Sequence, residues 1–158
     1  MKRIIYSLSG LLLVLSSCLL SSCEEHELSP TSKNLAGSWY LTETTQIITC
    51  ASNPSLDTTL ILNDTINTVY TLKKDGSWLI SFNADTTIVG TWTVYDNNLN
   101  VDAKYVNLDL LWLRNYTIQK LTSKQLILNN HQEIEIRESA DDIPKMLLIN
   151  ETTKFTKL

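Results

Sequence analysis

Hydrophobic and polar residues alternate along most of the chain beyond residue 35, with the period of two that is typical of β-strands. The clearest case places Trp78, Ile80 and Phe82 on one side of a strand and Ser77 and Ser81 on the other. Helical periodicity is almost absent, and the region is rich in Thr, Ile, Val, Leu, Trp and Tyr. The pattern predicts about eight to ten short strands.

The expected strands cover the segments 39–44, 69–73, 77–82, 92–94, 99–101, 106–112, 116–118, 126–128, 134–136 and 146–149. The last segment follows Pro144, and its pattern extends toward Phe155. Between the last two segments, 139–145 (SADDIPK) is expected to be a loop or a single helical turn.

Tight turns join these strands. Asp75 and Gly76 lie between two of them, and Asp-Gly is a strong hairpin signal because both residues tolerate positive φ. The segments 96–98 (DNN) and 122–124 (TSK) mark two further turns. Strands joined by local turns pair antiparallel, and a long meander leaves two unpaired edges unless it closes on itself. We therefore predict an all-β fold, a small antiparallel up-and-down β-barrel, with a β-sandwich as the alternative.

The N-terminal segment has a different pattern. Lys2 and Arg3 precede an uncharged run from Ile4 to Leu20. A basic start, an apolar run and small residues after it are typical of a secretory signal. The run also has the length of a membrane helix of about 17–20 residues, but its Ser and Gly residues and its terminal position favour the signal. The sequence Leu-Ser-Ser-Cys occurs twice, ending at Cys18 and at Cys23, and resembles the lipobox of bacterial lipoproteins.

The lipobox resemblance implies that a cysteine thiol receives a diacylglycerol, that the signal is cut just before it, and that the new amine is acylated with a chain such as palmitate. Two or three buried chains make such an anchor stable. Cleavage at Cys18 would leave Leu19 and Leu20 beside the anchor, whereas cleavage at Cys23 leaves a polar stretch. We expect a signal peptide over 1–22 and lipidation of Cys23, with Cys18 as the alternative.

A polar tether is expected over 23–34, followed by one domain over 35–158. The acidic run after Cys23 resembles the signal that sends some Gram-negative lipoproteins to the outer face of the outer membrane. The sequence thus predicts a cell-envelope protein that is lipid-anchored to the outer membrane. An uncleaved or ordinary secretory signal with incidental cysteines is the alternative. Cys50 would be the single thiol after Cys23, and it is expected to be a buried free cysteine.

Charge narrows the set of partners. All 17 acidic residues and 11 of the 13 basic residues follow Cys23, so the mature chain has a net charge of −6. Because no basic patch is present, a nucleic-acid partner is not expected. An acidic surface also disfavours docking on anionic lipid head groups, so the acyl anchor would hold the protein at the membrane.

Three of the four glycines stand two residues before a tryptophan, at 37–39 (GSW), 76–78 (GSW) and 90–92 (GTW). Glycine lets the backbone bend or a side chain pass closely, and a residue two positions later points to the same face of a strand. The repeated spacing predicts a barrel with large aromatic side chains at one end. The alternative is that tryptophan is simply common in small β-cores.

Four segments in this order, LAGSWYLTET, YTLKKDGSW, GTWTVYDNNLNV and YTIQKLTSKQLIL, resemble the lipocalin-like domain of many secreted bacterial lipoproteins. The resemblance covers about residues 33–130. The segment 49–67 is longer than the usual connection in that family. The matching residues are Leu35, Gly37, Trp39, Asp75, Gly76, Gly90, Trp92, Leu99, Tyr116, Ile118, Leu121, Leu126 and Leu128.

This resemblance implies a calyx that holds a small apolar or amphipathic molecule. The expected ligand-binding residues are Trp39, Trp78, Trp92 and Tyr116. The resemblance also implies an arginine stacked on the first-strand tryptophan at the barrel floor, and a guanidinium on an indole is favourable by about 0.5–2 kcal/mol. Of Arg114 and Arg137, Arg114 is the expected partner, which makes Gly37, Trp39 and Arg114 the barrel-closing residues.

Catalytic chemistry is not indicated. His26 and His131 are far apart, no His or Cys pair has metal-ligand spacing, and no Gly-x-Ser-x-Gly or phosphate-binding loop occurs. Glu133, Glu135 and Glu138 are expected on the solvated face of one strand. We therefore expect no enzyme activity, no metal and no cofactor other than the covalent diacylglycerol and N-acyl chain.

Three Asp-Thr pairs, at 57–58, 64–65 and 85–86, resemble the acceptor of O-glycosylation in some Gram-negative envelopes, although Asp-Thr is also ordinary turn chemistry. Two functions remain open. The first is non-catalytic binding of a small apolar ligand inside the barrel. The second is a barrel filled by its own side chains, with an outer face that binds a protein or glycan partner at the cell surface.

Overall fold

A computed structural model of the 158-residue chain describes residues 30–83, 85–106, 108, 110–137 and 144–158. The expected signal peptide, both lipobox cysteines and most of the expected tether lie outside these residues. A short helix, α2, begins at Pro30, within the expected tether. No helix in the described part of the chain is long and apolar enough to cross a membrane.

The fold is all-β, as predicted. The described strands are β1 (Gly37–Cys50), β2 (Thr58–Asn63), β3 (Val69–Leu72), β4 (Ser77–Phe82), β5 (Asp85–Tyr95), β6 (Asn98–Tyr105), β7 (Leu111–Leu121), β8 (Gln125–Ile136) and β9 (Lys145–Lys157). The helix α2 covers Pro30–Leu35, and a 3₁₀ turn, η1, covers Pro54–Leu56.

Eight of these strands form a closed antiparallel barrel. Each strand from β3 to β9 pairs with the next along the chain, and β1 pairs with both β3 and β9, which closes the ring. The prediction of an up-and-down barrel is therefore confirmed. Strand β2 is additional: β3 pairs with β1 at Gly37–Tyr40, and β2 continues along β1 at Glu43–Ile48.

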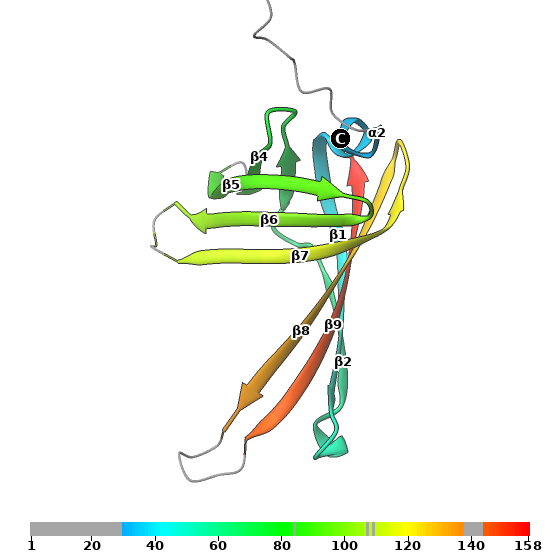
Figure 1. Ribbon diagram of the computed structural model, residues 1–158, viewed down its shortest axis with the longest axis vertical. Coiled ribbons are helices and arrows are strands. Elements are labelled where there is room, and N and C mark those ends of the chain that lie inside the picture. Colours follow the sequence, from blue (N-terminus) through cyan, green and yellow to red (C-terminus); the bar gives the residue numbers. More distant parts are fainter. Residues whose placement is uncertain (1–29, 84, 107, 109, 138–143) are drawn as a thin grey trace, which may run out of the picture.

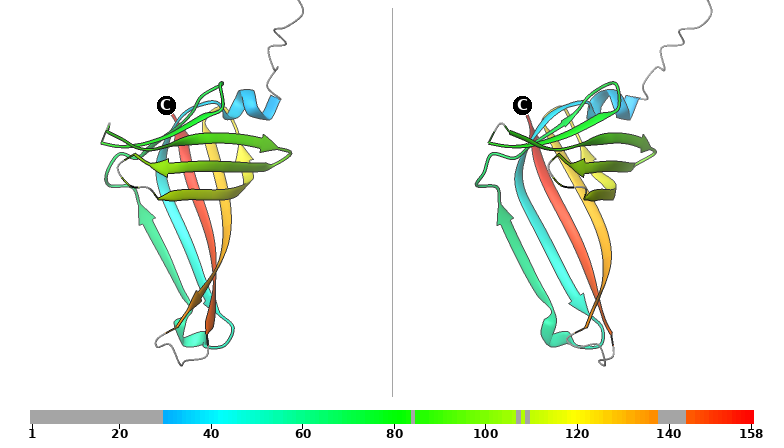
Figure 2. Two further views of the ribbon diagram at one scale, coloured as in Figure 1. Left: turned by 60° about the vertical axis from the view of Figure 1, so that its left-hand side comes forward. Right: turned by 90° about the vertical axis from the view of Figure 1, so that its left-hand side faces the viewer.

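Three strands are much longer than the barrel needs. β1, β8 and β9 have 14, 12 and 13 residues, whereas β3 has 4 and β4 has 6. Their far halves leave the barrel together with β2 as a four-stranded sheet in the order β2-β1-β9-β8 (Figures 1 and 2). We call this sheet the arm, with segments 43–50, 58–63, 130–136 and 145–151. The sequence predicted only short separate strands here.

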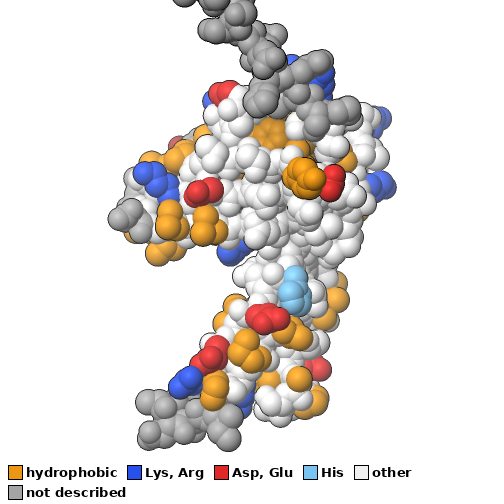
Figure 3. All heavy atoms as spheres, viewed as in Figure 1, with side chains coloured by type: hydrophobic (Ala, Val, Ile, Leu, Met, Phe, Trp, Pro, Cys, Tyr) orange, Lys and Arg blue, Asp and Glu red, His pale blue; other side chains and the backbone are white. Residues whose placement is uncertain are grey.

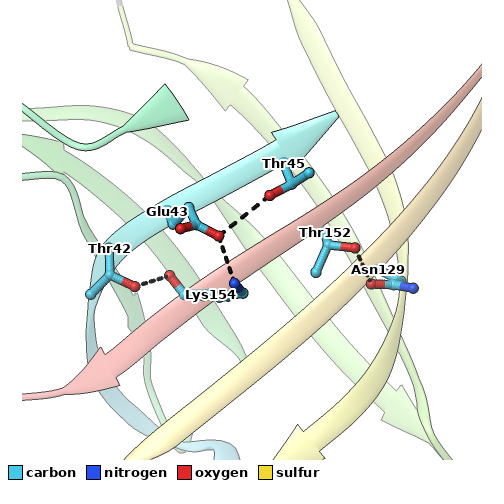
Figure 4. A network of polar contacts seen from close by, with 6 residues as sticks. All are labelled: Thr42, Glu43, Thr45, Asn129, Thr152 and Lys154. Carbon is cyan, nitrogen blue, oxygen red and sulfur yellow. Dashed lines mark hydrogen bonds and ion pairs between the residues drawn. The ribbon is translucent and has the colours of Figure 1, made fainter. Parts of the chain in front are cut away.

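A β-bulge marks the point where β1 passes from the barrel into the arm. The pairing with β9 shifts between Leu41 and Glu43, so that Thr42 is the extra residue. Lys154 Nζ donates to Glu43 Oε1 at 2.6 Å, and Thr42 Oγ1 donates to the Lys154 carbonyl at 2.9 Å (Figure 4). A bulge bends a strand, and these side-chain contacts bind the two long strands together beside the bend.

The three Gly-x-Trp pairs all place their tryptophan in the core. Trp78 of β4, Gly90 of β5, Ala103 of β6 and Trp112 of β7 are successive cross-strand partners, so they form one row on the inner face. The small residues in the middle leave room for two indoles, whose centroids are 6.3 Å apart. A Cβ built on Gly90 would lie 2.2 Å from the Asp102 carbonyl oxygen, so glycine is required there.

The end of the barrel beside α2 is closed by Trp39. Its Nε1 donates to the Leu35 carbonyl at 2.8 Å. The cation above its ring is Lys157, with Nζ 4.8 Å from the centroid, and this Nζ also donates to the Asn34 and Ala36 carbonyls. The expected Arg114 contact is therefore corrected: β7 places Arg114 over Trp112, at 5.4 Å.

One predicted strand begins later than its pattern indicated. The alternation over 106–112 predicted a strand, but β7 begins at Leu111, and Val106, Leu108 and Leu110 lie in the connection from β6. These three side chains are exposed, as are Leu111 and Leu113 on the outer face of β7. Figure 3 shows hydrophobic side chains gathered at this projecting hairpin end.

We predict that Gly90→Ala lowers the free energy of unfolding by about 3 kcal/mol, because the added methyl group would overpack a backbone contact. Chemical denaturation measures this change. Thr93→Ala, an exposed change on the same strand, is the control and should cost less than about 0.5 kcal/mol. Equal stability of the Gly90→Ala and parent proteins would contradict the described packing of β5 on β6.

Candidate ligand-binding site

The four residues expected to bind a ligand lie in a filled part of the barrel. Trp39 and Trp78 are fully buried, and Trp92 and Tyr116 are only 5% and 4% exposed. They pack with Leu72, Leu99, Leu126, Leu128 and Phe155 in one hydrophobic cluster. A ligand would reach these side chains only if that packing opened, so their role in binding remains a prediction.

Partly exposed apolar side chains also line one face of the arm. Because side chains alternate along a strand, the inner face of the barrel continues directly onto one face of the arm, which we call the trough. Its aliphatic residues are Ile48, Leu60, Leu62, Ile134, Ile136, Leu147 and Ile149. Leu60, Leu62 and Ile134 are 42%, 52% and 40% exposed, and the other four are half-buried. No described element covers this face as a second layer.

The opposite face of the arm is more polar. Lys154 and Glu43 form an ion pair on this side beside the bulge, and Arg137, directly after β8, has its Nη2 2.6 Å from Glu135 Oε1. Three aliphatic side chains are also exposed on this face: Ile47, Ile61 and Met146. His131 Nδ1 is 2.7 Å from Asn150 Oδ1, so this histidine serves as a surface contact on the arm. The expectation that Glu133 and Glu135 lie on a solvated strand face is confirmed, whereas Glu138 lies outside the described residues.

A polar row separates the filled core from the part of the trough on β8 and β9, whereas Leu60 of β2 pairs with this row and Leu62 lies nearer the barrel. Asn130 of β8, Glu151 of β9 and Gln46 of β1 are cross-strand partners on the inner face. Gln46 Nε2 donates to Glu151 Oε2 at 2.8 Å, and Asn130 Nδ2 donates to the Asn115 carbonyl at 2.7 Å. The second contact bridges β7 and β8 just beyond their last paired residues, Thr117 and Asn129. The barrel opens at this level, which we call the mouth.

Arg114 lies at the mouth. It alternates with Trp112 and Tyr116 on the inner face of β7, and its guanidinium lies over the Trp112 ring. Its Nη1 donates a hydrogen bond to the adjacent Leu113 carbonyl at 3.0 Å. Within the described residues, no carboxylate comes close enough to form an ion pair with it.

Two tyrosines near the mouth have raised pKa values. Burial raises the pKa of Tyr70 and of Tyr116, the charge of Glu151 adds to both shifts, and Arg114 opposes them. Both hydroxyls therefore stay protonated at neutral pH and remain able to donate hydrogen bonds. The Trp78 indole lies between Tyr70 and Trp112, and its buried Nε1 has no hydrogen-bond partner among the described residues.

Another hollow lies on the outside of the barrel. It is shallow, has a volume of about 510 Å³, and spans the outer faces of β4 to β7. Leu79, Val89 and Leu111 form its apolar part, with Lys73, Lys104 and Asp102 around them. It borders the exposed hairpin end, so these two surfaces form one outer patch that is separate from the trough.

Other residues singled out in the sequence have structural roles. Asp57 accepts the Cys50 amide at 2.8 Å, and Asp64 accepts the Thr68 amide at 2.6 Å, which is turn chemistry. Cys50 is a buried free cysteine, as predicted. Among the described residues, no three His, Cys, Asp or Glu side chains are placed to share a metal ion.

Comparisons with known proteins add little. No family model matches the sequence, and no curated protein matches it. One solved structure, a polyisoprenoid binding domain from Saccharophagus degradans implicated in plant cell wall breakdown, covers 76% of this chain and 98% of its own length. Its identity to this chain is 6% and its TM-score is 0.39. A similarity this low says nothing about what this chain binds.

We predict that the free energy of unfolding falls as the pH rises above about 10, the ordinary pKa of tyrosine. The folded state raises the pKa of Tyr70 and Tyr116, so this stabilisation is complete below the unfolded pKa and is lost at higher pH. Denaturation curves at alkaline pH measure the loss. Tyr70→Phe should reduce the slope, and Tyr95→Phe, at an exposed position, should leave it unchanged; equal slopes for both variants would contradict the prediction.

Proposed function

We propose that this protein is a lipid-anchored envelope lipoprotein that binds a small apolar or amphipathic ligand without catalysis, and that the ligand lies in the trough. The observation that carries this proposal is the aliphatic inner face of the arm. It continues the inner face of the barrel and remains open to solvent at Leu60, Leu62 and Ile134.

Energetics favour the trough over the barrel interior as the binding surface. Covering exposed aliphatic side chains contributes about 25 cal/mol per Å² of apolar surface removed from water. A ligand in the filled core would instead have to displace packed indoles, and losing such packing costs about 3–5 kcal/mol for one large aromatic side chain. The trough requires no such displacement.

The lipid anchor fits this arrangement. If Cys23 carries the acyl chains, six residues lie between it and Pro30. The seven residue-to-residue steps from Cys23 to Pro30 span at most about 25 Å when extended. Helix α2 lies at the end of the barrel opposite the tip of the arm (Figure 1). The barrel would then lie between the anchor and the trough, and the trough would be open to ligands in the surrounding solution.

A second candidate function is a protein- or glycan-interaction module. The observation that favours it is the outer patch, where Leu111 is 70% exposed and Val106, Leu108, Leu110 and Leu113 are also exposed. Contiguous exposed apolar side chains of this kind mark interaction sites in soluble domains. On this view the filled barrel serves as a rigid support.

We predict that Ile149→Asn weakens binding of the neutral apolar fluorophore N-phenylnaphthylamine about tenfold, because it places an amide on the trough. Fluorescence titration of residues 24–158 measures the dissociation constant. Leu148→Asn is the matched control: its side chain is also half-buried, but it lies on the other face of β9. It should change the affinity less than about twofold.

The outcomes of this titration separate the two candidate functions. An equal loss in both variants would indicate an effect on stability rather than on the trough, and it would contradict the proposal. Absence of probe binding to the parent protein would also contradict it and would favour the interaction module.

We predict that Cys23→Ser abolishes incorporation of labelled palmitate in a Gram-negative host, because the acylated thiol and amine belong to that residue. Cys18→Ser should still incorporate it. Gel analysis of the labelled protein reads out both variants. Loss of the label in Cys18→Ser but not in Cys23→Ser would assign the lipid anchor to Cys18. If neither the parent protein nor the variants incorporate the label, the lipoprotein assignment is refuted.

A further inference from the structure

The polar groups at the mouth lie where the trough begins. Arg114 and Tyr116 lie two residues apart on the inner face of β7, and the Arg114 guanidinium lies over Trp112. The Trp112 ring is next to Trp78, and the Trp78 ring is next to Tyr70. Glu151, whose charge acts on the same tyrosines, belongs to the polar row from which Ile149 and Leu147 continue along β9. One end of an elongated ligand in the trough would therefore meet this cluster.

Among the described residues, Glu151 accepts hydrogen bonds from side chains, whereas Arg114 donates to no side chain. The Glu151 carboxylate accepts hydrogen bonds from Gln46 Nε2 at 2.8 Å and from Thr153 Oγ1 at 3.5 Å. The Arg114 guanidinium donates to one backbone carbonyl and lies against the Trp112 ring. A guanidinium has five N–H donors in a fixed plane that matches carboxylate and phosphate oxygens. Its remaining donors are available to such a ligand.

The neighbouring groups add further donors. The Tyr70 and Tyr116 hydroxyls remain protonated, and the Trp78 Nε1–H is fully buried without an acceptor. A buried donor without an acceptor costs about 1–3 kcal/mol, so an acceptor in this layer would be favourable. The mouth is thus rich in donors, and Arg114 supplies a positive charge there beside the negative charge of Glu151.

We propose that the ligand is a single-chain amphiphile with an oxyanion head, whose head binds Arg114 at the mouth and whose aliphatic chain lies along the trough. This rests on the proposed function and names the class of ligand for the same site. The charge of Arg114 complements the head, and the aliphatic residues of β1, β2, β8 and β9 cover the chain. The six residues from Lys145 to Asn150 give the trough a length of about 20 Å.

The test compares three ligands with the same alkyl chain: dodecanoate, dodecyl phosphate and dodecanol. Isothermal titration at neutral pH measures their binding to residues 24–158 and to three variants. Arg114→Gln removes the charge, and Arg114→Lys keeps it without the planar fork. Arg137→Gln is the matched control, because it removes one arginine from the opposite face of the arm, where Arg137 is paired with Glu135.

The parent protein should bind at least one of the two anions about tenfold more tightly than dodecanol. Arg114→Gln should bring that preference to within about twofold while dodecanol binding stays unchanged, which also shows that the variant is folded. Arg114→Lys should keep part of the preference, and Arg137→Gln all of it. Which anion is preferred distinguishes a carboxylate head from a phosphate head.

Three results would overturn this assignment. Equal affinity of the parent protein for all three ligands would contradict the recognition of an oxyanion head. Because dodecanol would still bind, this result would not contradict the proposed function. A preference that survives in Arg114→Gln would exclude Arg114 as the binding group. Binding of none of the three ligands would refute the proposed function together with the inference.

Discussion

The backbone ladder between β1 and β9 is the constraint on which the rest of the structure depends. It joins the first and last strands and so closes the barrel. It also continues past the barrel to Cys50 and Leu147, where β3 and β7 no longer accompany it. Backbone N–H and C=O groups need partners when they are removed from water. Once β1 and β9 extend together, β2 and β8 pair along their outer edges, and the arm results.

The same sheet therefore has two different interiors. Inside the barrel, Trp39, Trp78 and Trp92 fill the space, and the row through Gly90 and Ala103 shows how closely the strands approach. Beyond the mouth, the inner face has no opposing wall among the described strands, and its aliphatic residues remain partly exposed. A filled barrel and an open apolar surface are thus consequences of one topology. This division is why we place the ligand on the arm rather than among the indoles.

Local patterns predicted what depends on neighbours in sequence. Alternation found the strands, the Asp75-Gly76 turn was identified from its residue types, and the Gly-x-Trp spacing identified core tryptophans. The contact of Arg114 with Trp112 could have been predicted from the sequence, because residues two apart share a strand face. The position of Lys157 over Trp39 could not be predicted, because it depends on the closure of the barrel. The arm was missed for the same reason: Thr, Asn and Gln interrupt the apolar pattern of β1, β8 and β9, and only their mutual pairing shows that each is one long strand.

The opposite error also occurs, where the sequence predicts a strand and the structure has a connection. Val106, Leu108 and Leu110 continue a strand pattern, yet they lie in the connection between β6 and β7, because a strand also needs a partner to pair with. The apolar residues of this segment were expected in a strand and are exposed instead. The candidate site was missed because its polar row, Gln46, Asn130 and Glu151, comes from three distant parts of the chain.

The measurement that tests the central claim most directly is methyl-labelled NMR of residues 24–158 with dodecanoate or dodecanol bound. The account predicts intermolecular NOEs from the alkyl chain to the methyl groups of Ile48, Ile134 and Ile149, and none to the indole protons of Trp39. NOEs to Trp39 and Trp92 in place of the isoleucines would put the ligand inside the barrel and would contradict the account.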